Sequence, residues 1–215
     1  MVTHYIHRGL AKKNFKENTL SAFKYSFKQK YGIETDLQVT KDNQLICFHD
    51  FNLRRKFNLN KNVKDINYSS LKKISKKRKA TVPLLKDLLK ISKNRYPLLL
   101  EIKPLLTKLS LLSLIKLIKK TKKYGIFSFK EKNLINLYKL NKGLSLGLLF
   151  LSNSNLRVIK SKSKKPHVKF LGLEKSFLSN KKLTKIRKPI FYYTVKRKEL
   201  FKKYKNNKNL IFENL

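Results

Sequence analysis

The sequence holds little of several residues whose presence defines whole classes of protein. Among its 215 residues there is one cysteine, no tryptophan, six glycines and five prolines. A lone Cys47 excludes an intramolecular disulfide framework and fits a reducing compartment, so we predict a cytoplasmic location. The first residues, Met-Val-Thr-His-Tyr-Ile-His, also lack the charged start and long apolar run of a signal peptide.

Long uncharged hydrophobic runs are missing as well. The nearest approach, residues 105–118, is interrupted by Lys108 and Lys116, whereas a spanning helix needs about 20 predominantly apolar residues. We interpret this stretch as an amphipathic helix of a globular protein. With 41% hydrophobic residues, the chain is long enough to form one domain with a sizeable core.

Acidic residues are scarce, with 12 Asp and Glu against 53 Lys and Arg and a net charge of +41. Such a charge raises the alternative of a non-catalytic barrel that binds nucleic acid or an anionic membrane. Only eight of the basic residues are arginine, however, and the lysines are spread over the chain. This usage, with abundant Asn, Phe, Tyr and Leu, also resembles that of an AT-biased genome. We therefore expect no specific nucleic-acid binding, only a weak attraction to anionic surfaces and substrates.

Apolar patterns with period 2 alternate with helical patterns along most of the chain. We predict strands at residues 2–7, 33–39, 98–103, 125–128, 144–150, 168–173, 189–195 and 209–213. Helices are expected at 18–30, 83–91, 109–122, 131–140, 153–161, 179–186 and 197–205. Eight alternating units are typical of an α/β protein with a closed (β/α)8 TIM-type barrel. Residues 1–215 are thus predicted to form a single catalytic barrel domain. In it, residues 51–81 form a compact, irregular insertion over the barrel mouth, with one short helix near 69–75.

Residues 33–50 contain a predicted hairpin around the polar turn at 41–43. Glu34 and Asp36, two residues apart on its first strand, point to the same face. Counting back from a tight turn places Thr40 opposite Leu45 and Asp36 opposite His49. The hairpin would therefore bring two acids and a histidine within a few ångströms of each other.

Carboxylates recur where the first barrel strands end, which is the working face of such a fold. Glu34 and Asp36 lie on the second strand and Glu101 lies near the end of the third. Three converging carboxylates without thiolates describe a site for a hard divalent cation, Mg²⁺ or Ca²⁺.

Two histidines and two cations accompany these acids. His7 ends the first strand and His49 returns on the hairpin, and histidines near neutral pKa can serve as general acid and base. Arg8 and Lys103 supply positive charge for an anionic group held between them. Together with the metal, this set suits hydrolysis of a phosphodiester.

The motifs in the first half of the chain closely resemble those of the glycerophosphodiester phosphodiesterases. The resemblance rests on His7-Arg8-Gly9, Glu17-Asn18-Thr19, Glu34-Thr35-Asp36, Thr40-Lys41-Asp42, His49-Asp50 with Leu53 and Arg55, Val82-Pro83-Leu84-Leu85 and Leu100-Glu101-Ile102-Lys103. Beyond residue 103 the match is weaker, with Tyr193-Thr194-Val195 and Ile211-Phe212-Glu213-Asn214 resembling later strands of the family.

The resemblance implies a barrel enzyme that hydrolyses glycerophosphodiesters to glycerol 3-phosphate and an alcohol. In it His7 and His49 would be the acid–base pair, and Glu34, Asp36 and Glu101 the metal ligands. Arg8 and Lys103 would bind the substrate phosphate. The family's proposed route, attack by the substrate's own glycerol hydroxyl through a cyclic phosphate, would need no Ser or Cys nucleophile.

Departures from the family pattern fall on the wall and rim of the expected pocket. Tyr193 stands where the family usually has Trp and is a candidate for the pocket wall. Lys196 replaces an Asn, and Glu213 replaces an Asp. A larger lipid such as a lysophospholipid is therefore an alternative substrate. The released alcohol, the native metal and the oligomeric state stay open.

Four polar residues outside this set receive structural interpretations. Asn18 is expected to be a helix N-cap, with Glu17 beside it at the helix start. His4 is assigned to packing or to the surface, because it faces away from His7, and His167 has no partner that the sequence identifies.

Overall fold

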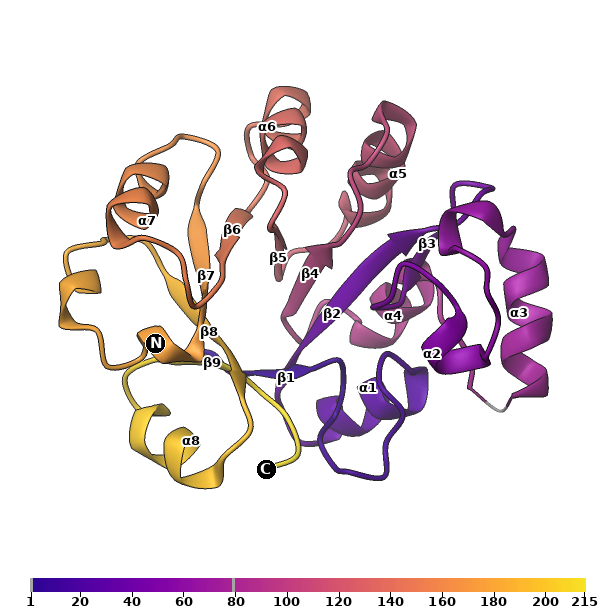
Figure 1. The fold of residues 1–215 in the computed structure, drawn as a ribbon, viewed down its shortest axis with the longest axis horizontal. Helices are drawn as coiled ribbons and strands as arrows, with labels where there is room; N and C mark the ends of the chain where they lie inside the picture. Colours follow the sequence, from indigo (N-terminus) through magenta and orange to yellow (C-terminus); the bar gives the residue numbers. More distant parts are fainter. Residues whose placement is uncertain (1, 79) are drawn as a thin grey trace.

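The computed structural model describes residues 2–78 and 80–215, and these include a closed barrel of eight parallel strands (Figure 1). The barrel strands are β1 (Tyr5–His7), β2 (Gly32–Val39), β4 (Leu98–Ile102), β5 (Tyr124–Ser128), β6 (Leu146–Phe150), β7 (Phe170–Glu174), β8 (Ile190–Val195) and β9 (Asn209–Phe212). Strand β1 pairs in parallel with both β2 and β9, which closes the ring. The predicted (β/α)8 fold class is confirmed.

Helices connect the strands around the outside of the barrel (Figure 1). They are α1 (Leu20–Lys28), α4 (Leu85–Ser92), α5 (Lys108–Ile118), α6 (Glu131–Leu140), α7 (Leu156–Ser163) and α8 (Lys198–Tyr204). The helix predicted at 179–186 is wrong: two 3₁₀ turns, Lys175–Phe177 and Lys181–Leu183, stand between β7 and β8. Asn180 accepts a hydrogen bond from the Lys182 amide, a local bond that competes with helix formation.

Two apolar layers hold the barrel together. The larger lies between the sheet and the helices, and the smaller fills the barrel with Tyr5, Leu99, Phe127, Leu149, Phe170 and Ile211. Inside the barrel a Cβ at Gly147 would meet the Phe170 ring at 2.2 Å. Glycine at this position therefore makes room for the ring that fills the barrel centre.

The hairpin arm β3 (Leu45–Cys47) pairs antiparallel with β2, with Leu37 opposite Cys47 and Val39 opposite Leu45. This register differs by one residue from the prediction. The Thr40 amide donates a hydrogen bond to the Gln44 carbonyl, so the loop between the arms has three residues. Its last residue, Asn43, has a φ of 57°, which lies in the left-handed region. Phe48 rather than His49 therefore lies opposite Asp36. The Phe48 amide donates a hydrogen bond to the Asp36 carbonyl.

The predicted insertion is more regular than its sequence suggests. It contains α2 (Arg54–Phe57), a 3₁₀ turn at Val63–Asp65 and α3 (Tyr68–Lys77), which is longer than the short helix expected near 69–75. Its hydrophobic residues form a separate buried cluster with β3 and the start of α4, comprising Ile46, Phe48, Leu53, Phe57, Val63, Ile66, Leu71, Ala80, Val82 and Leu84. Figure 1 shows these helices beside β3. Residue 79 lies outside the described residues.

Within the described part of the chain, every helix is too short or too polar to cross a lipid bilayer.

Candidate active site

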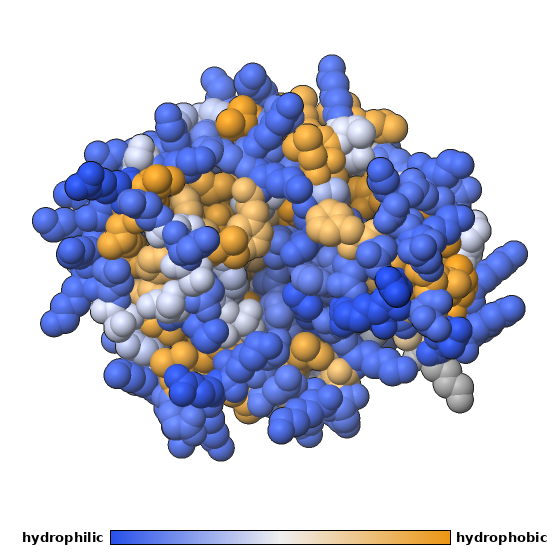
Figure 2. Space-filling view, viewed as in Figure 1, coloured by the Kyte–Doolittle hydropathy of each residue, from blue (hydrophilic) through white to orange (hydrophobic). Residues whose placement is uncertain are grey.

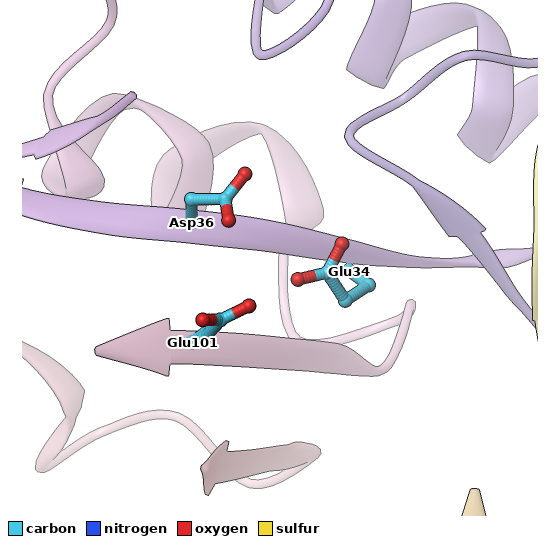
Figure 3. A group of neighbouring side chains, drawn as sticks. All are labelled: Glu34, Asp36 and Glu101. Atoms are coloured by element: carbon cyan, nitrogen blue, oxygen red, sulfur yellow. The ribbon is translucent and has the colours of Figure 1, made fainter. Parts of the chain in front are cut away.

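Three carboxylates converge on the inner side of the barrel near the carboxyl ends of β2 and β4. Glu34 and Asp36 alternate on β2, and the register places Asp36 opposite Glu101 of β4. One carboxylate oxygen from each residue lies within 4.8 Å of the other two. Figure 3 shows the three side chains close together, with Glu34 and Asp36 on β2 and Glu101 on β4. The structure therefore brings together the predicted metal ligands.

The environment of these carboxylates favours a bound cation. Burial, followed by the charges of Asp36 and Glu101, raises the pKa of Glu34 well above its usual value. Burial and the charge of Asp36 also raise the pKa of Glu101 to about 7, although Lys103 opposes that shift. Glu34 Oε2 and Asp36 Oδ1 are buried without a hydrogen-bond partner among the described residues. Such unsatisfied oxygens are the ligands that Mg²⁺ and Ca²⁺ take, so the residues fit a hard divalent ion.

Two cations flank the acidic group. Lys103 Nζ lies 2.9 Å from Glu101 Oε1 and 3.7 Å from Asp36 Oδ1. Arg8 Nε lies 2.9 Å from Asp36 Oδ2 as an ion pair without an aligned hydrogen bond. Burial alone would raise the pKa of Asp36, but the charges of Arg8, His49 and Lys103 hold it below its usual range. Asp36 is therefore ionised at neutral pH.

The turn after β1 directs Arg8 toward Asp36, and two of its residues have positive φ angles. Arg8 and Gly9 have φ values of 51° and 73°, and a Cβ at Gly9 would meet Phe23 at 2.8 Å. The left-handed conformation and the close helix α1 both favour glycine there. Arg8 Nη1 then donates to Glu17 Oε2 at 2.8 Å.

Asn18 differs from its predicted role. The N-cap of α1 is Thr19, whose hydroxyl accepts a hydrogen bond from the Ala22 amide. Asn18 is buried with a φ of 54°, donates to Asp36 Oδ2 at 3.1 Å and accepts from the Thr35 hydroxyl at 2.7 Å. It therefore fixes the orientation of Asp36, a role that its position before a helix does not reveal in the sequence.

His7 lies at the end of β1, and its Nδ1 is hydrogen-bonded to Glu213 Oε2. Its Nε2 lies 3.8 Å from Glu34 Oε2. Burial lowers the pKa of His7, and the hydrogen bond with Glu213 opposes the shift without reversing it. A neutral imidazole that donates through Nδ1 leaves Nε2 free to accept a proton.

His49 follows β3, and Asp50 holds its Nδ1 at 2.7 Å. The second oxygen of Asp50 accepts a hydrogen bond from Arg55 Nε at 2.6 Å, and Arg55 also binds Glu17. The pairing fixes the ring through Nδ1 and leaves Nε2 free. His49 and Asp36 lie at the same end of the barrel despite the changed register, because His49 continues the arm beyond Phe48.

These side chains surround a cavity of about 420 Å³, lined in part by His7, Arg8, His49, Glu101, Lys103 and Tyr193. Tyr193 contributes to the wall, and its hydroxyl donates to the Phe150 carbonyl at 2.7 Å. Its ring meets the edge of Phe129 at a centroid distance of 6.2 Å. Burial raises the pKa of Tyr193, and the carboxylates of Glu101 and Glu174 add to the shift, so this residue stays protonated.

The other two histidines lie outside this cavity. His4 Nδ1 accepts a hydrogen bond from the Leu210 amide, and its ring packs against Phe201. His167 Nε2 lies 3.0 Å from Glu131 Oε1, a partner that the sequence did not identify. Both contacts join neighbouring elements of the barrel.

Fold and site together define a (β/α)8-barrel hydrolase with paired histidines and an acidic cluster at the carboxyl ends of its strands. The model of the glycerophosphoryl diester phosphodiesterase family matches residues 7–208. The chain belongs to this family and is an enzyme of the glycerophosphodiester phosphodiesterase class.

Individual relatives agree with this assignment. A glycerophosphodiester phosphodiesterase from Bacillus altitudinis is 28% identical over an alignment of 202 positions, and the match covers 83% of this chain and 81% of the relative. Human lysophospholipase D is 41% identical over 69 residues, a match to 32% of this chain and only 22% of the human protein.

Solved structures support the fold. A glycerophosphodiester phosphodiesterase from Thermotoga maritima superposes with a TM-score of 0.85 at 21% identity, covering 100% of this chain and 95% of that one. An Oleispira antarctica phosphodiesterase in complex with the product sn-glycerol-3-phosphate gives a TM-score of 0.81 at 18% identity, with 99% and 92% coverage.

Proposed function

We propose that the chain hydrolyses glycerophosphodiesters to glycerol 3-phosphate and an alcohol, with His7 and His49 as its acid–base pair. The observation that carries the proposal is the cavity at the barrel mouth, which both histidines line together with Glu101. Support for the substrate class comes from the family and from the product complex of the Oleispira enzyme.

Glu34, Asp36 and Glu101 would hold a divalent metal, Mg²⁺ or Ca²⁺. When bound, such an ion supplies Lewis-acid stabilisation of negative charge on the phosphoryl oxygens. Arg8 and Lys103, which flank the acidic group, bind the anionic phosphate and stabilise the charge that develops during the reaction. The side-chain amide of Asn18 donates to Asp36 and keeps its carboxylate oriented toward the other two proposed metal ligands.

The histidines transfer the protons. His7, neutral because partial burial lowers its pKa, accepts the proton of the attacking hydroxyl at Nε2. This hydroxyl would be the substrate's own glycerol group, as in the route proposed for the family. His49, whose Nδ1 is held by Asp50, donates a proton from Nε2 to the leaving oxygen, so the alcohol departs as the glycerol oxygen bonds to phosphorus. Water would then open this cyclic phosphate to glycerol 3-phosphate, losing a proton to one histidine while the glycerol oxygen regains a proton from the other.

The test is a panel of glycerophosphodiesters assayed for glycerol 3-phosphate with Mg²⁺, with Ca²⁺ and with chelator. We expect chelator to abolish turnover, and His7→Ala and His49→Ala each to lower kcat about 10²–10⁴-fold, the usual range for a general acid or base. His167→Ala is the matched control, because its partner Glu131 belongs to α6 on the barrel exterior. Wild-type turnover in both histidine variants would disprove the assignment.

A further inference from the structure

Large hydrophobic side chains are exposed along one side of the barrel mouth. Phe51, Leu105, Phe129 and Leu151 follow β3, β4, β5 and β6, and Leu109 lies in the first turn of α5. We call these five residues the apolar crescent. Leu109 is 63% exposed and the others are 39–53% exposed, although the surface is mostly hydrophilic (Figure 2). The sheet order β6-β5-β4-β2-β3 places the loops that carry these residues one after another around the mouth, and such clustering on a highly charged protein marks a binding surface.

Part of the crescent lines a groove of about 720 Å³ between the hairpin and the start of α5. This volume lies within the roughly 300–1,000 Å³ typical of small-molecule sites. Its apolar walls are formed by Val39, Phe51, Pro104, Leu105, Leu106 and Leu109. The amide of Asn43 is already bonded to the hydroxyls of Ser110 and Ser113 at 2.6 and 3.0 Å. The groove therefore offers mainly apolar contact to a ligand.

The groove and the catalytic cavity are lined by neighbouring residues of the same two loops. Lys103 lines the cavity and the next residue, Pro104, lines the groove. Likewise, Phe129 lines the cavity and Lys130 lines the groove. The hairpin arm adds a third junction, with His49 in the cavity and Phe51 in the groove. A ligand that spans these shared loops would therefore occupy both spaces.

The charges beside the groove indicate what kind of apolar ligand it suits. Lys41, Lys64 and Lys130 line it, and no carboxylate is among its described lining residues. Lys130 Nζ also lies 5.8 Å above the Phe51 ring, which keeps a positive charge at the groove edge. An apolar chain attached to an anionic phosphodiester matches both the walls and the rim.

We propose that this groove binds the acyl chain of a singly acylated glycerophosphodiester, a lysophospholipid, whose phosphodiester occupies the catalytic cavity. The inference rests on the proposed function and names its substrate class. In the net reaction the P–O bond to the headgroup alcohol breaks and one water is consumed. Its oxygen remains on phosphorus and its protons are shared between the released alcohol and the phosphate, leaving a monoacylglycerol phosphate.

The experiment compares kcat/KM for glycerophosphocholine with kcat/KM for lysophosphatidylcholines of increasing chain length, all below their critical micelle concentrations. Each methylene that enters the groove should raise kcat/KM by up to about fourfold, the factor that burial of one methylene provides. Leu105→Ser and Leu109→Ser should lower the ratio of the two substrates about tenfold. Leu117→Ser is the matched control, since Leu117 is 36% exposed near the far end of α5 and does not line the groove.

Binding in the presence of chelator separates this inference from the proposed function. Calorimetry of wild type with a monomeric lysophosphatidylcholine should show a negative heat-capacity change, reduced in Leu109→Ser. Hydrolysis of glycerophosphocholine with no chain-length dependence, or an equal ratio in wild type and both groove variants, would overturn the groove and leave the proposed function standing. A preference that arises only on vesicles would assign the crescent to a membrane surface and overturn the inference. Absence of all phosphodiesterase activity despite tight, groove-dependent lipid binding would instead refute the proposed function.

Discussion

Among single residues, Glu213 fixes the tautomer of His7 and opposes the lowering of the His7 pKa that burial causes. One carboxylate oxygen is hydrogen-bonded to His7 Nδ1, and the other lies 2.8 Å from Lys196 Nζ. Although burial opposes it, these two partners lower the pKa of Glu213 to about 2. The stability contributed by this carboxylate is therefore present above its ordinary pKa of 4.5 and is lost as the pH falls toward 2. Across the neutral range it stays negatively charged beside the proposed base.

Glu213→Gln should shift the pH dependence of catalysis. The negative charge of Glu213 opposes the lowering of the His7 pKa, so its removal lets that pKa fall further. The acid limb of the kcat/KM profile reports the base in the free enzyme, and we expect it to move down by about one pH unit, equivalent to about 1.4 kcal/mol. Glu213→Asp, which keeps the charge, should retain the wild-type limb. Superimposable profiles for wild type and Glu213→Gln would show that Glu213 does not act on His7.

The candidate site was predictable at this scale wherever a residue type is rare in the chain. With only four histidines and 12 acids, their recurrence at strand ends identified the residues that the structure brings together. Lys56, by contrast, is one lysine among many, yet it is half-buried, and this burial lowers its pKa to about 8. Its amine donates to the Glu17 carbonyl at 3.0 Å, a contact that depends on packing between distant segments.

At the scale of elements, α2 connects the insertion to both sides of the catalytic cavity. Arg55 binds Asp50, which orients His49, and also binds Glu17, which orients Arg8. Hydrogen bonds from Arg55 and Arg8 lower the pKa of Glu17 despite its burial. One guanidinium therefore couples the positions of a proposed acid and a proposed phosphate ligand.

Arg55→Lys should lower kcat/KM about tenfold, or about 1.4 kcal/mol in transition-state free energy, without altering the fold. A lysine has a single ammonium group and cannot reproduce the fork that spans two carboxylates. Because both residues act through His49, the double variant Asp50→Asn/Arg55→Lys should lose less than the product of the single losses. Arg54→Lys, an exposed change in the same helix, is the control. Fully multiplicative losses would indicate that Arg55 only supports local structure.

Sequence patterns identified the elements better than the details within them. The strand ends that carry His7 and Glu101 follow from short apolar runs before polar residues. The hairpin register was off by one because it depends on Asn43 adopting a left-handed conformation, which a Lys-Asp-Asn turn allows but does not require. In the insertion, Phe57 and Leu71 are isolated in the sequence and are buried only through contact with other segments.

For the whole molecule, the alternation of strands and helices was enough to predict the barrel, because each helix buries one apolar stripe against the same sheet. That pattern does not specify which loops carry exposed apolar side chains, so the apolar crescent could be identified only from the structure. The net charge of +41 is likewise a property of the entire chain, and its 13 described ion pairs include few of the 53 basic residues. The uncompensated charge produces a long-range positive potential at the mouth.

That potential should make catalysis on anionic substrates depend on ionic strength. The Debye length falls from about 30 Å at 0.01 M salt to about 8 Å at 0.15 M, which removes most long-range attraction. We expect kcat/KM for glycerophosphoglycerol, an anion, to fall several-fold relative to that for zwitterionic glycerophosphocholine across this range. Sucrose at matched osmolarity should leave the ratio unchanged. An equal fall of kcat/KM for both substrates would contradict this and show that salt acts on the enzyme itself. Only a ligand with a net charge is attracted by the field before it reaches Arg8 and Lys103.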